Sequence, residues 1–124
     1  MHEFGLAQEI AERLKAEAER EGARRIIAVD IEVGGLVHGN VDNIAFWVKE
    51  ALGEELGKDA TVRAARAAAS LLCQDCRRRS SRAPSENEEW DAYSLPARCP
   101  HCGSARVRVK GDTGCLIRHL ELER

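Results

Sequence analysis

The chain has 124 residues, and its 19 lysines and arginines against 21 aspartates and glutamates give a formal net charge of −2. This balance argues against a protein whose main work is coating nucleic acid. No run of about 20 apolar residues could span a membrane, and the opening Met1-His2-Glu3-Phe4 carries an acid where a secretory signal needs basic charge. We therefore expect a cytoplasmic protein of one domain, or of one domain with a small satellite.

A helix is predicted from Phe4 to Arg20, because apolar residues recur there with helical spacing while charged residues fill the other face. The apolar positions are Ala7, Ile10, Ala11, Leu14 and Ala18. Gly22 then provides a stop.

A strand is predicted next, because apolar residues alternate with other residues at the period of two that a half-buried strand needs. The expected core face consists of Ile27, Val29, Ile31 and Val33. Gly34-Gly35 ends the strand.

A second helix is predicted after Asn40 or Asp42, either of which can cap it. Its apolar stripe consists of Val41, Ile44, Ala45, Val48 and Leu52. Gly53 closes the helix, and we expect a loop from Gly53 to Lys58.

The segment from Ala60 to Leu72 gives conflicting signals. Six alanines and the absence of glycine and proline favour a helix. Alternation supports a strand only at Ala60, Val62 and Ala64. The residues alone therefore favour a helix.

The segment from Cys73 to Gly111 has no periodicity and holds two C-x-x-C knuckles, Cys73-Gln74-Asp75-Cys76 and Cys99-Pro100-His101-Cys102, separated by 22 residues. Two intervening residues let both thiolates of a knuckle turn toward one point, so two facing knuckles offer four sulfurs in a tetrahedron. We expect a structural zinc site that folds this module, because too few apolar groups are present for it to fold alone.

Two rival interpretations of the knuckles stay open. A thiol redox pair would usually show a single C-x-x-C. A nucleic-acid zinc ribbon would use the basic cluster Arg77 to Arg82, but acidic residues follow this cluster and no aromatic residues are interleaved with it. Within the second knuckle, His101 is either a surface residue or a residue that tunes or relays the metal.

The last predicted element is a strand from Cys115 to Glu123, after a turn at residues 111–114. Leu116, Leu120 and Leu122 share its expected core face, on which Arg118 is a misfit. Cys115 is left over from the knuckles, and we expect it to be a small buried apolar residue.

The amino terminus offers a second metal site. The terminal amine of Met1, the backbone nitrogen of His2 and the near imidazole nitrogen of His2 can close two fused chelate rings. The backbone nitrogen of Glu3 or an outside group can fill the fourth position. Planar nitrogen coordination suits Ni(II) and Cu(II), although a polar helix start explains the same residues without a metal.

Several features spread from end to end of the chain form one pattern: Met1-His2-Glu3, Gly34-Gly35-Leu36, Phe46 and Trp47, the paired knuckles, and Gly114 followed by Ile117-Arg118 and residues 120–123. This pattern resembles the hydrogenase-maturation nickel metallochaperones of the HypA/HybF family. The resemblance implies an α+β fold with two helices on a three-stranded mixed sheet, and a four-cysteine zinc module inserted before the last strand.

The resemblance also implies boundaries and sites. Residues 1–70 plus 112–124 would form the nickel-binding domain, and residues 71–111 the zinc-binding module. The segment from Ala60 to about Ala68 would be the middle strand, against its propensity. Met1, His2 and Glu3 would bind nickel, with Glu3 orienting or tuning the site, and zinc would be held by Cys73, Cys76, Cys99 and Cys102.

The function that the resemblance implies is not enzymatic. The protein would carry transiently bound Ni(II) from a nickel-binding maturation GTPase to the precursor of the large subunit of a nickel–iron hydrogenase, or in some organisms to urease. Whether the chain forms a homodimer is left open. Two alternatives are a zinc-ribbon adaptor that binds protein or nucleic acid, and a redox sensor that uses Cys115.

Overall fold

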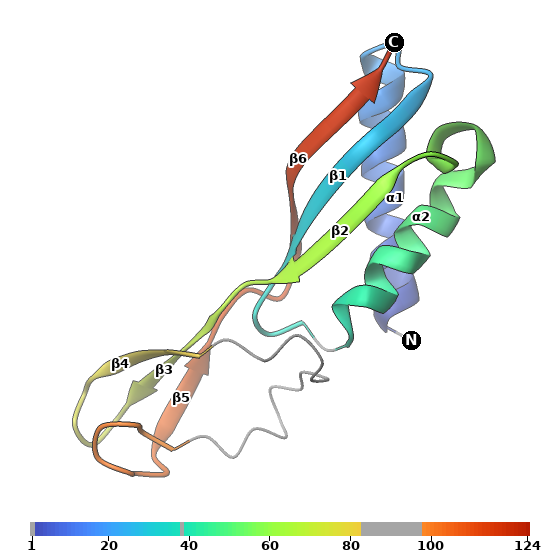
Figure 1. The fold of residues 1–124 in the computed structure, drawn as a ribbon. Coiled ribbons are helices and arrows are strands. Elements are labelled where there is room, and N and C mark those ends of the chain that lie inside the picture. The colour runs from blue at the N-terminus through green and yellow to red at the C-terminus, as the bar shows by residue number, and fades with distance from the viewer. Residues whose placement is uncertain (1, 38, 83–97) are drawn as a thin grey trace.

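A computed structural model describes residues 2–37, 39–82 and 98–124, which form two helices and two three-stranded sheets. In chain order the elements are α1 (His2–Arg20), β1 (Arg25–Val33), α2 (Val41–Gly57), β2 (Thr61–Arg66), β3 (Ala69–Cys73), β4 (Arg79–Arg82), β5 (Val107–Lys110) and β6 (Cys115–Glu123). The two sheets lie at opposite ends of the molecule (Figure 1). Neither helix is long and apolar enough to cross a membrane.

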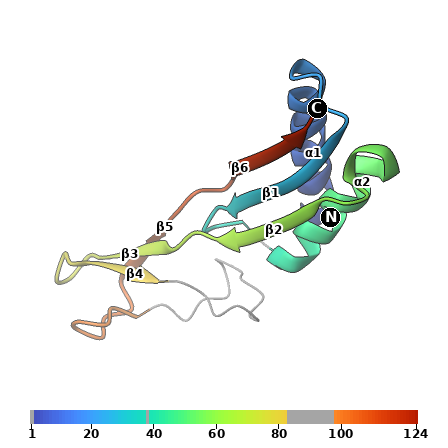
Figure 2. The same ribbon diagram turned by 45° about the horizontal axis from the view of Figure 1, so that its top comes forward.

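The larger sheet has the strand order β2-β1-β6 and is mixed. β1 pairs in parallel with β2 and antiparallel with β6, and α2 is the crossover that parallel neighbours require. Both helices cover the same face of this sheet (Figures 1 and 2). The predicted α+β fold, with the cysteine module before the last strand, is confirmed.

The core of this part is aliphatic, and α1 supplies the apolar face that its sequence predicts. All five expected positions on α1 are buried: Ala7, Ile10, Ala11, Leu14 and Ala18. Gly22, two residues after the end of α1, has a φ of 65°, a left-handed conformation that glycine adopts without steric cost.

The segment after Ala60 is a strand, so the helix favoured by its alanines is wrong. Val62 and Ala64 pair with Val29 and Ile31 of β1 and pack against the core, and this tertiary pairing overrides helix propensity. The position expected for this strand is also wrong. β2 lies at an edge of the sheet and ends at Arg66, whereas β1 is the middle strand because β6 pairs with its other side.

Two register irregularities change which side chains face the core. Ile26 pairs with Leu122 and Ala28 with Glu121, so Ile27 is skipped in the ladder. Ile26 is consequently buried, while Ile27 is 47% exposed, against the prediction that Ile27 faces the core.

The second irregularity lies in β6, where Asp30 pairs with His119 and Ile31 with Ile117, so that Arg118 is the extra residue. An extra residue in one strand reverses the facing of the side chains on either side of it. Ile117 therefore contacts the core, and Leu116, which we expected to do so, is 51% exposed.

The two ends of α2 differ in how well the sequence predicts them. Asn40 is the cap, because its side-chain oxygen accepts hydrogen bonds from the backbone nitrogens of Asp42 (2.8 Å) and Asn43 (3.2 Å). Gly53 breaks the helix with a φ of 84°, but another helical turn follows and ends at Gly57. The expected loop from Gly53 to Lys58 is therefore wrong.

The smaller sheet has the order β4-β3-β5, with both pairings antiparallel. The sequence shows no periodicity after Cys73, so these short strands were not expected. In β3 alternate residues face inward, and Ala69, Leu71 and Cys73 are buried. Regular structure in this part thus begins before the first knuckle.

Gly34 and Gly35 lie where the two sheets join. The Gly34 amide donates to the Gly114 carbonyl (2.8 Å), and the Leu36 amide donates to the Asp112 carbonyl (2.9 Å). A Cβ on Gly34 would lie 2.6 Å from the Gly114 oxygen, and one on Gly35 would lie 3.1 Å from the Ala69 nitrogen. The glycine pair is therefore needed because both connections between the sheets pass against it.

Candidate metal centre

The four knuckle cysteines come together at the end of the smaller sheet. Their sulfurs all lie within 4.8 Å of one another, with 3.6 Å between those of Cys73 and Cys102 and 3.5 Å between those of Cys76 and Cys99. Among the residues that the structure describes, no other histidine, cysteine or acidic residues form a comparable group.

Each knuckle is a tight turn that points amide groups at its first sulfur. The Cys73 amide donates to the Arg78 carbonyl (3.1 Å), and the Cys99 amide donates to the Ser104 carbonyl (2.9 Å). The Cys76 amide donates to the Cys73 sulfur, and the His101 amide to the Cys99 sulfur, each at 3.4 Å. The two knuckles therefore have similar geometry, as a four-sulfur site requires.

The residue after each knuckle has a positive φ. It is 75° at Gly103 and 61° at Arg77. Glycine adopts this conformation freely, whereas another residue pays about 1 kcal/mol for it. The first knuckle thus holds a strained residue at the position where the second knuckle has glycine.

The knuckle sulfurs sit in a partly closed site. Cys73 and Cys99 are buried, Cys76 is half-buried and Cys102 is exposed. Hydrogen bonds from the Cys76 amide first, and then from the Asp75 amide, lower the pKa of Cys73 to about 6. Although the Ser104 amide lowers it, the hydrogen bond with the Cys73 sulfur and burial raise the pKa of Cys102 to about 12. The sulfurs therefore share their protons, and a metal has to displace those that remain when it binds the thiolates.

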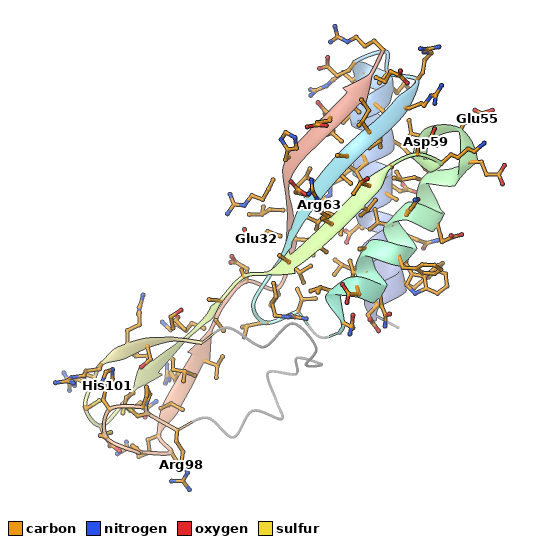
Figure 3. The ribbon with its side chains drawn as sticks, viewed as in Figure 1. Glu32, Glu55, Asp59, Arg63, Arg98 and His101 are labelled. Atoms are coloured by element: carbon orange, nitrogen blue, oxygen red, sulfur yellow. The ribbon has the colours of Figure 1, made fainter. Side chains whose placement is uncertain are left out.

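The donor set limits which metal fits. Four thiolates in a tetrahedron suit zinc or an iron–sulfur centre, whereas Mg²⁺ and Ca²⁺ require oxygen ligands. The residues present therefore fit the expected zinc ion. His101 lies beside the cluster without belonging to it, since its exposed ring is 3.4 Å from the Arg78 guanidinium. Figure 3 labels His101 at this end of the molecule.

Cys115 is separate from the cluster and lies at the start of β6. It is buried, as expected from its place in an apolar strand. Burial raises the pKa of Cys115, which lowers the thiolate fraction that a redox sensor needs. The environment of Cys115 therefore does not favour the redox alternative.

The expected nickel ligands are described only in part. Met1 and the side chain of His2 lie outside the described residues, and His2 is the first residue of α1. The Glu3 carboxylate accepts a hydrogen bond from the Asn40 amide (3.1 Å). Gly39 has a φ of 126°, and a Cβ there would lie 2.6 Å from Cγ of Glu3. Glu3 thus ties the first turn of α1 to the start of α2.

Two features near Glu3 are not apparent from sequence patterns. Phe4 packs edge-to-face against Trp47 with 5.3 Å between the ring centroids, and Phe46 packs against Trp47 at 5.1 Å. The side chain of Arg66 reaches the loop before α2 and donates to carbonyls at Gly34, Val37 and Gly39. No spacing in the sequence signals the latter contact, because Arg66 stands among alanines.

Comparison with known proteins gives a consistent result. The model of the family described as hydrogenase/urease nickel incorporation, metallochaperone, hypA matches residues 1–122. A hydrogenase maturation factor HypA of Thermococcus onnurineus is 27% identical and covers 100% of this chain and 97% of its own. A hydrogenase maturation factor HybF of Morganella morganii is 28% identical, covering 99% and 100%.

Solved structures agree on the fold. The solution structure of the Ni metallochaperone HypA from Helicobacter pylori has a TM-score of 0.57 and 18% sequence identity. The match covers 99% of this chain and 98% of that one. At this identity the likeness concerns the fold, namely two helices on a mixed sheet with a four-cysteine module.

Proposed function

Because the chain belongs to the HypA family, we propose that it is a nickel metallochaperone that delivers Ni(II) during hydrogenase maturation. The observation that carries this proposal is the family match over residues 1–122, supported by relatives that this chain covers almost completely. The same family description includes urease, so delivery to urease is part of the proposal. A chaperone of this kind binds and releases its cargo and is not an enzyme.

We propose that nickel binds at Met1, His2 and Glu3, through the terminal amine of Met1, the backbone and imidazole nitrogens of His2, and the backbone nitrogen of Glu3. The hydrogen bond from Asn40 to the Glu3 carboxylate supports this set. This bond holds the first turn of α1, which carries these nitrogens, against the loop before α2. Four nitrogens in a plane suit Ni(II).

The second proposed metal is a structural zinc ion held by Cys73, Cys76, Cys99 and Cys102. It is supported by the distances among the four sulfurs and by the matching hydrogen bonds of the two knuckles. When bound, zinc would crosslink the two knuckles and supply folding free energy to the smaller sheet.

We propose that each sheet belongs to a part of the chain with its own metal. Residues 1–70 plus 112–124 would form the nickel-binding domain and residues 71–111 the zinc-binding module. The strand β3 runs across the first boundary, since it begins at Ala69. The proposed partners are a nickel-binding maturation GTPase, which supplies the metal, and the precursor of the hydrogenase large subunit, which receives it.

The test of this function is a calorimetric titration of tag-free, zinc-loaded protein with Ni(II). His2→Ala removes the imidazole and should abolish the nickel site, and one residue added before Met1 should do the same by converting the amine into an amide. His119→Ala is a matched control, because His119 is exposed on β6 and contacts Glu121. Nickel bound equally well by the His2→Ala and His119→Ala variants would exclude the proposed site.

A second readout is pH. The amine and imidazole, with reference pKa values of about 7.7 to 8.0 and about 6.5, must lose protons before they bind metal, and each backbone nitrogen of the proposed set gives up its amide proton as it binds. Nickel affinity should therefore rise with pH through this range in the wild-type protein. A flat profile would show that other groups hold the metal.

A further inference from the structure

Arg66 is the last residue of β2, and its guanidinium is committed to a single loop. Nη1 donates to the Gly34 carbonyl (3.2 Å) and to the Val37 carbonyl, and Nη2 donates to the Gly39 carbonyl. These three carbonyls all belong to the connection between β1 and α2. The loop therefore takes its shape from a side chain on a different strand.

The charge of Arg66 is held by carbonyl groups. Among the residues that the structure describes, no carboxylate lies within ion-pair distance of it. Burial lowers its pKa, which reflects the cost of holding a charge away from water. The carbonyl dipoles of the loop are what offset this cost, so the loop and the guanidinium depend on each other.

The contact with Gly39 leads directly to Glu3. The Gly39 carbonyl and the Asn40 amide are the two ends of one planar peptide group. Arg66 donates a hydrogen bond to the oxygen of this peptide group. The N–H of the same group, which belongs to Asn40, donates to the Glu3 carboxylate at 3.1 Å. A donor on one side polarises a peptide group and strengthens its N–H as a donor on the other side.

The fit on the Glu3 side is close. A Cβ on Gly39 would lie 2.6 Å from Cγ of Glu3, and Gly39 has a φ of 126°. The peptide can hold its orientation only if Gly39 stays in this conformation. Arg66, the peptide and Glu3 thus form a continuous chain of contacts that ends one residue from His2.

We propose that Arg66 is a positioning residue for the nickel-binding segment: through the Gly39–Asn40 peptide it holds Glu3, and with it the first turn of α1, in the geometry that nickel requires. The proposal rests on the proposed function, because it concerns the site at His2. Among the described residues, the path from Arg66 to Glu3 runs through this peptide.

The experiment compares nickel affinity, by calorimetry on tag-free zinc-loaded protein, among variants of the full chain. Arg66→Gln should weaken nickel binding about 10-fold, as for the loss of a group that orients a metal ligand. Arg63→Gln is the matched control, because Arg63 lies on the same strand but is exposed and pairs with Asp30; its nickel affinity should equal that of the wild type.

A double-mutant cycle separates positioning from a general loss of stability. If Arg66 acts through Glu3, then the Glu3→Ala/Arg66→Gln protein should bind nickel no more weakly than the Glu3→Ala protein. The backbone amide signal of Asn40 in an NMR spectrum should shift in Arg66→Gln before nickel is added, and should not shift in Arg63→Gln. Additive losses of affinity in the cycle would overturn the proposal.

Three further outcomes keep the test decisive. If Arg66→Gln does not fold, Arg66→Lys replaces it, because lysine keeps the charge but cannot donate to three carbonyls with a planar guanidinium. The nickel affinity of Arg66→Lys should be intermediate. A wild-type affinity in that variant would contradict the proposed role of Arg66. If His2→Ala retains nickel, the proposed function fails first. If His2→Ala loses nickel while Arg66→Gln binds it normally, the role of Arg66 alone is wrong.

Discussion

The larger sheet lies under two helices and a continuous aliphatic core, whereas the smaller sheet, in the part that the structure describes, has few buried side chains and ends at a cluster of four sulfurs. The residues with no exposed surface at the larger sheet are Ile10, Leu14, Ile26, Val29, Val33, Ile44 and Val48, along with Ala7. At the smaller sheet the buried residues are Ala69, Leu71, Cys73 and Cys99. Burial of apolar area can fold the first region, but the second depends on a crosslink.

The two regions also differ in charge. Residues 69–82 and 98–111 contain eight lysines and arginines and a single acid, Asp75. Residues 2–66 and 112–124 contain eleven basic and sixteen acidic residues. A basic end, where Arg98 and His101 lie, thus faces away from an acidic end, where Glu55 and Asp59 lie (Figure 3). The net charge of −2 also includes four acidic residues between positions 83 and 97.

The largest effect is expected from removing the crosslink between the two knuckles. Cys76→Ser, or a strong chelator, should unfold β3, β4 and β5, because metal binding contributes about 10 kcal/mol or more to the folding of such modules. The amide signals of α1, α2 and β1 should persist in an NMR spectrum, and zinc content should fall to near zero. Unfolding of both sheets in one step would contradict the comparison.

The opposite change targets the aliphatic core. Leu14→Ala should lower the free energy of unfolding of the larger sheet by about 2 to 5 kcal/mol, because it leaves a cavity where a fully buried side chain was. Urea denaturation followed by circular dichroism measures this loss. Zinc content should stay at the wild-type value, and Phe46→Ala, at a side chain that is 56% exposed, should cost much less.

Cys115 tests whether the fifth cysteine belongs to the core or to the crosslink. Cys115→Ala should retain zinc and cost about 1 kcal/mol, as for a small buried group. Burial raises the pKa of Cys115 above its ordinary value of 9.0, so above about pH 9 the unfolded state loses this proton first. The free energy of unfolding should therefore fall as pH rises through this range, and Cys115→Ala should show a smaller fall. Loss of zinc in the variant would make Cys115 a ligand.

The smallest expected effect concerns the shape of the first knuckle. Arg77→Gly should stabilise the zinc-loaded smaller sheet by about 0.5 to 1 kcal/mol, because glycine adopts the φ of 61° without strain. Arg79→Gly, two residues on and in the extended strand β4, should instead destabilise it by a similar amount. Thermal melting of the two variants side by side decides, and equal melting temperatures would show that the strain is negligible.

Periodicity and spacing were sufficient for part of this molecule. The apolar face of α1, the Asn40 cap and the meeting of the four knuckle cysteines follow from local pattern, because each depends on residues that are near in sequence or chemically distinctive. The family resemblance was needed to recognise β2 as a strand, since its alanines favour a helix and only pairing with β1 determines its structure.

Other features depend on contacts that no local pattern encodes. The skipped Ile27 and the extra Arg118 arise from how β1 and β6 fit together, so an alternating sequence predicted the wrong faces for Ile27 and Leu116. The contact of Arg66 with the loop before α2 joins residues 27 to 32 positions apart. The sequence did not predict the strand β3, because Leu71 and Leu72 continue the alanine-rich segment from Ala60, whose composition favours a helix.

The chain passes from the larger sheet to the smaller one and back again beside Gly34 and Gly35. The cysteine-bearing part is therefore an insertion that could be exchanged for another. The Ala67 amide donates to the Val33 carbonyl and the Leu36 amide donates to the Asp112 carbonyl, so the chain departs from and returns to the same turn. The last residue of β2, Arg66, and the first residue of β6, Cys115, both pair with Val33 of β1. They are therefore separated by two strand spacings, about 10 Å, a distance that about three extended residues can span. Replacing residues 68–111 with a short glycine-containing bridge should leave a minimal protein that keeps the larger sheet and both helices, onto which unrelated inserts could be grafted.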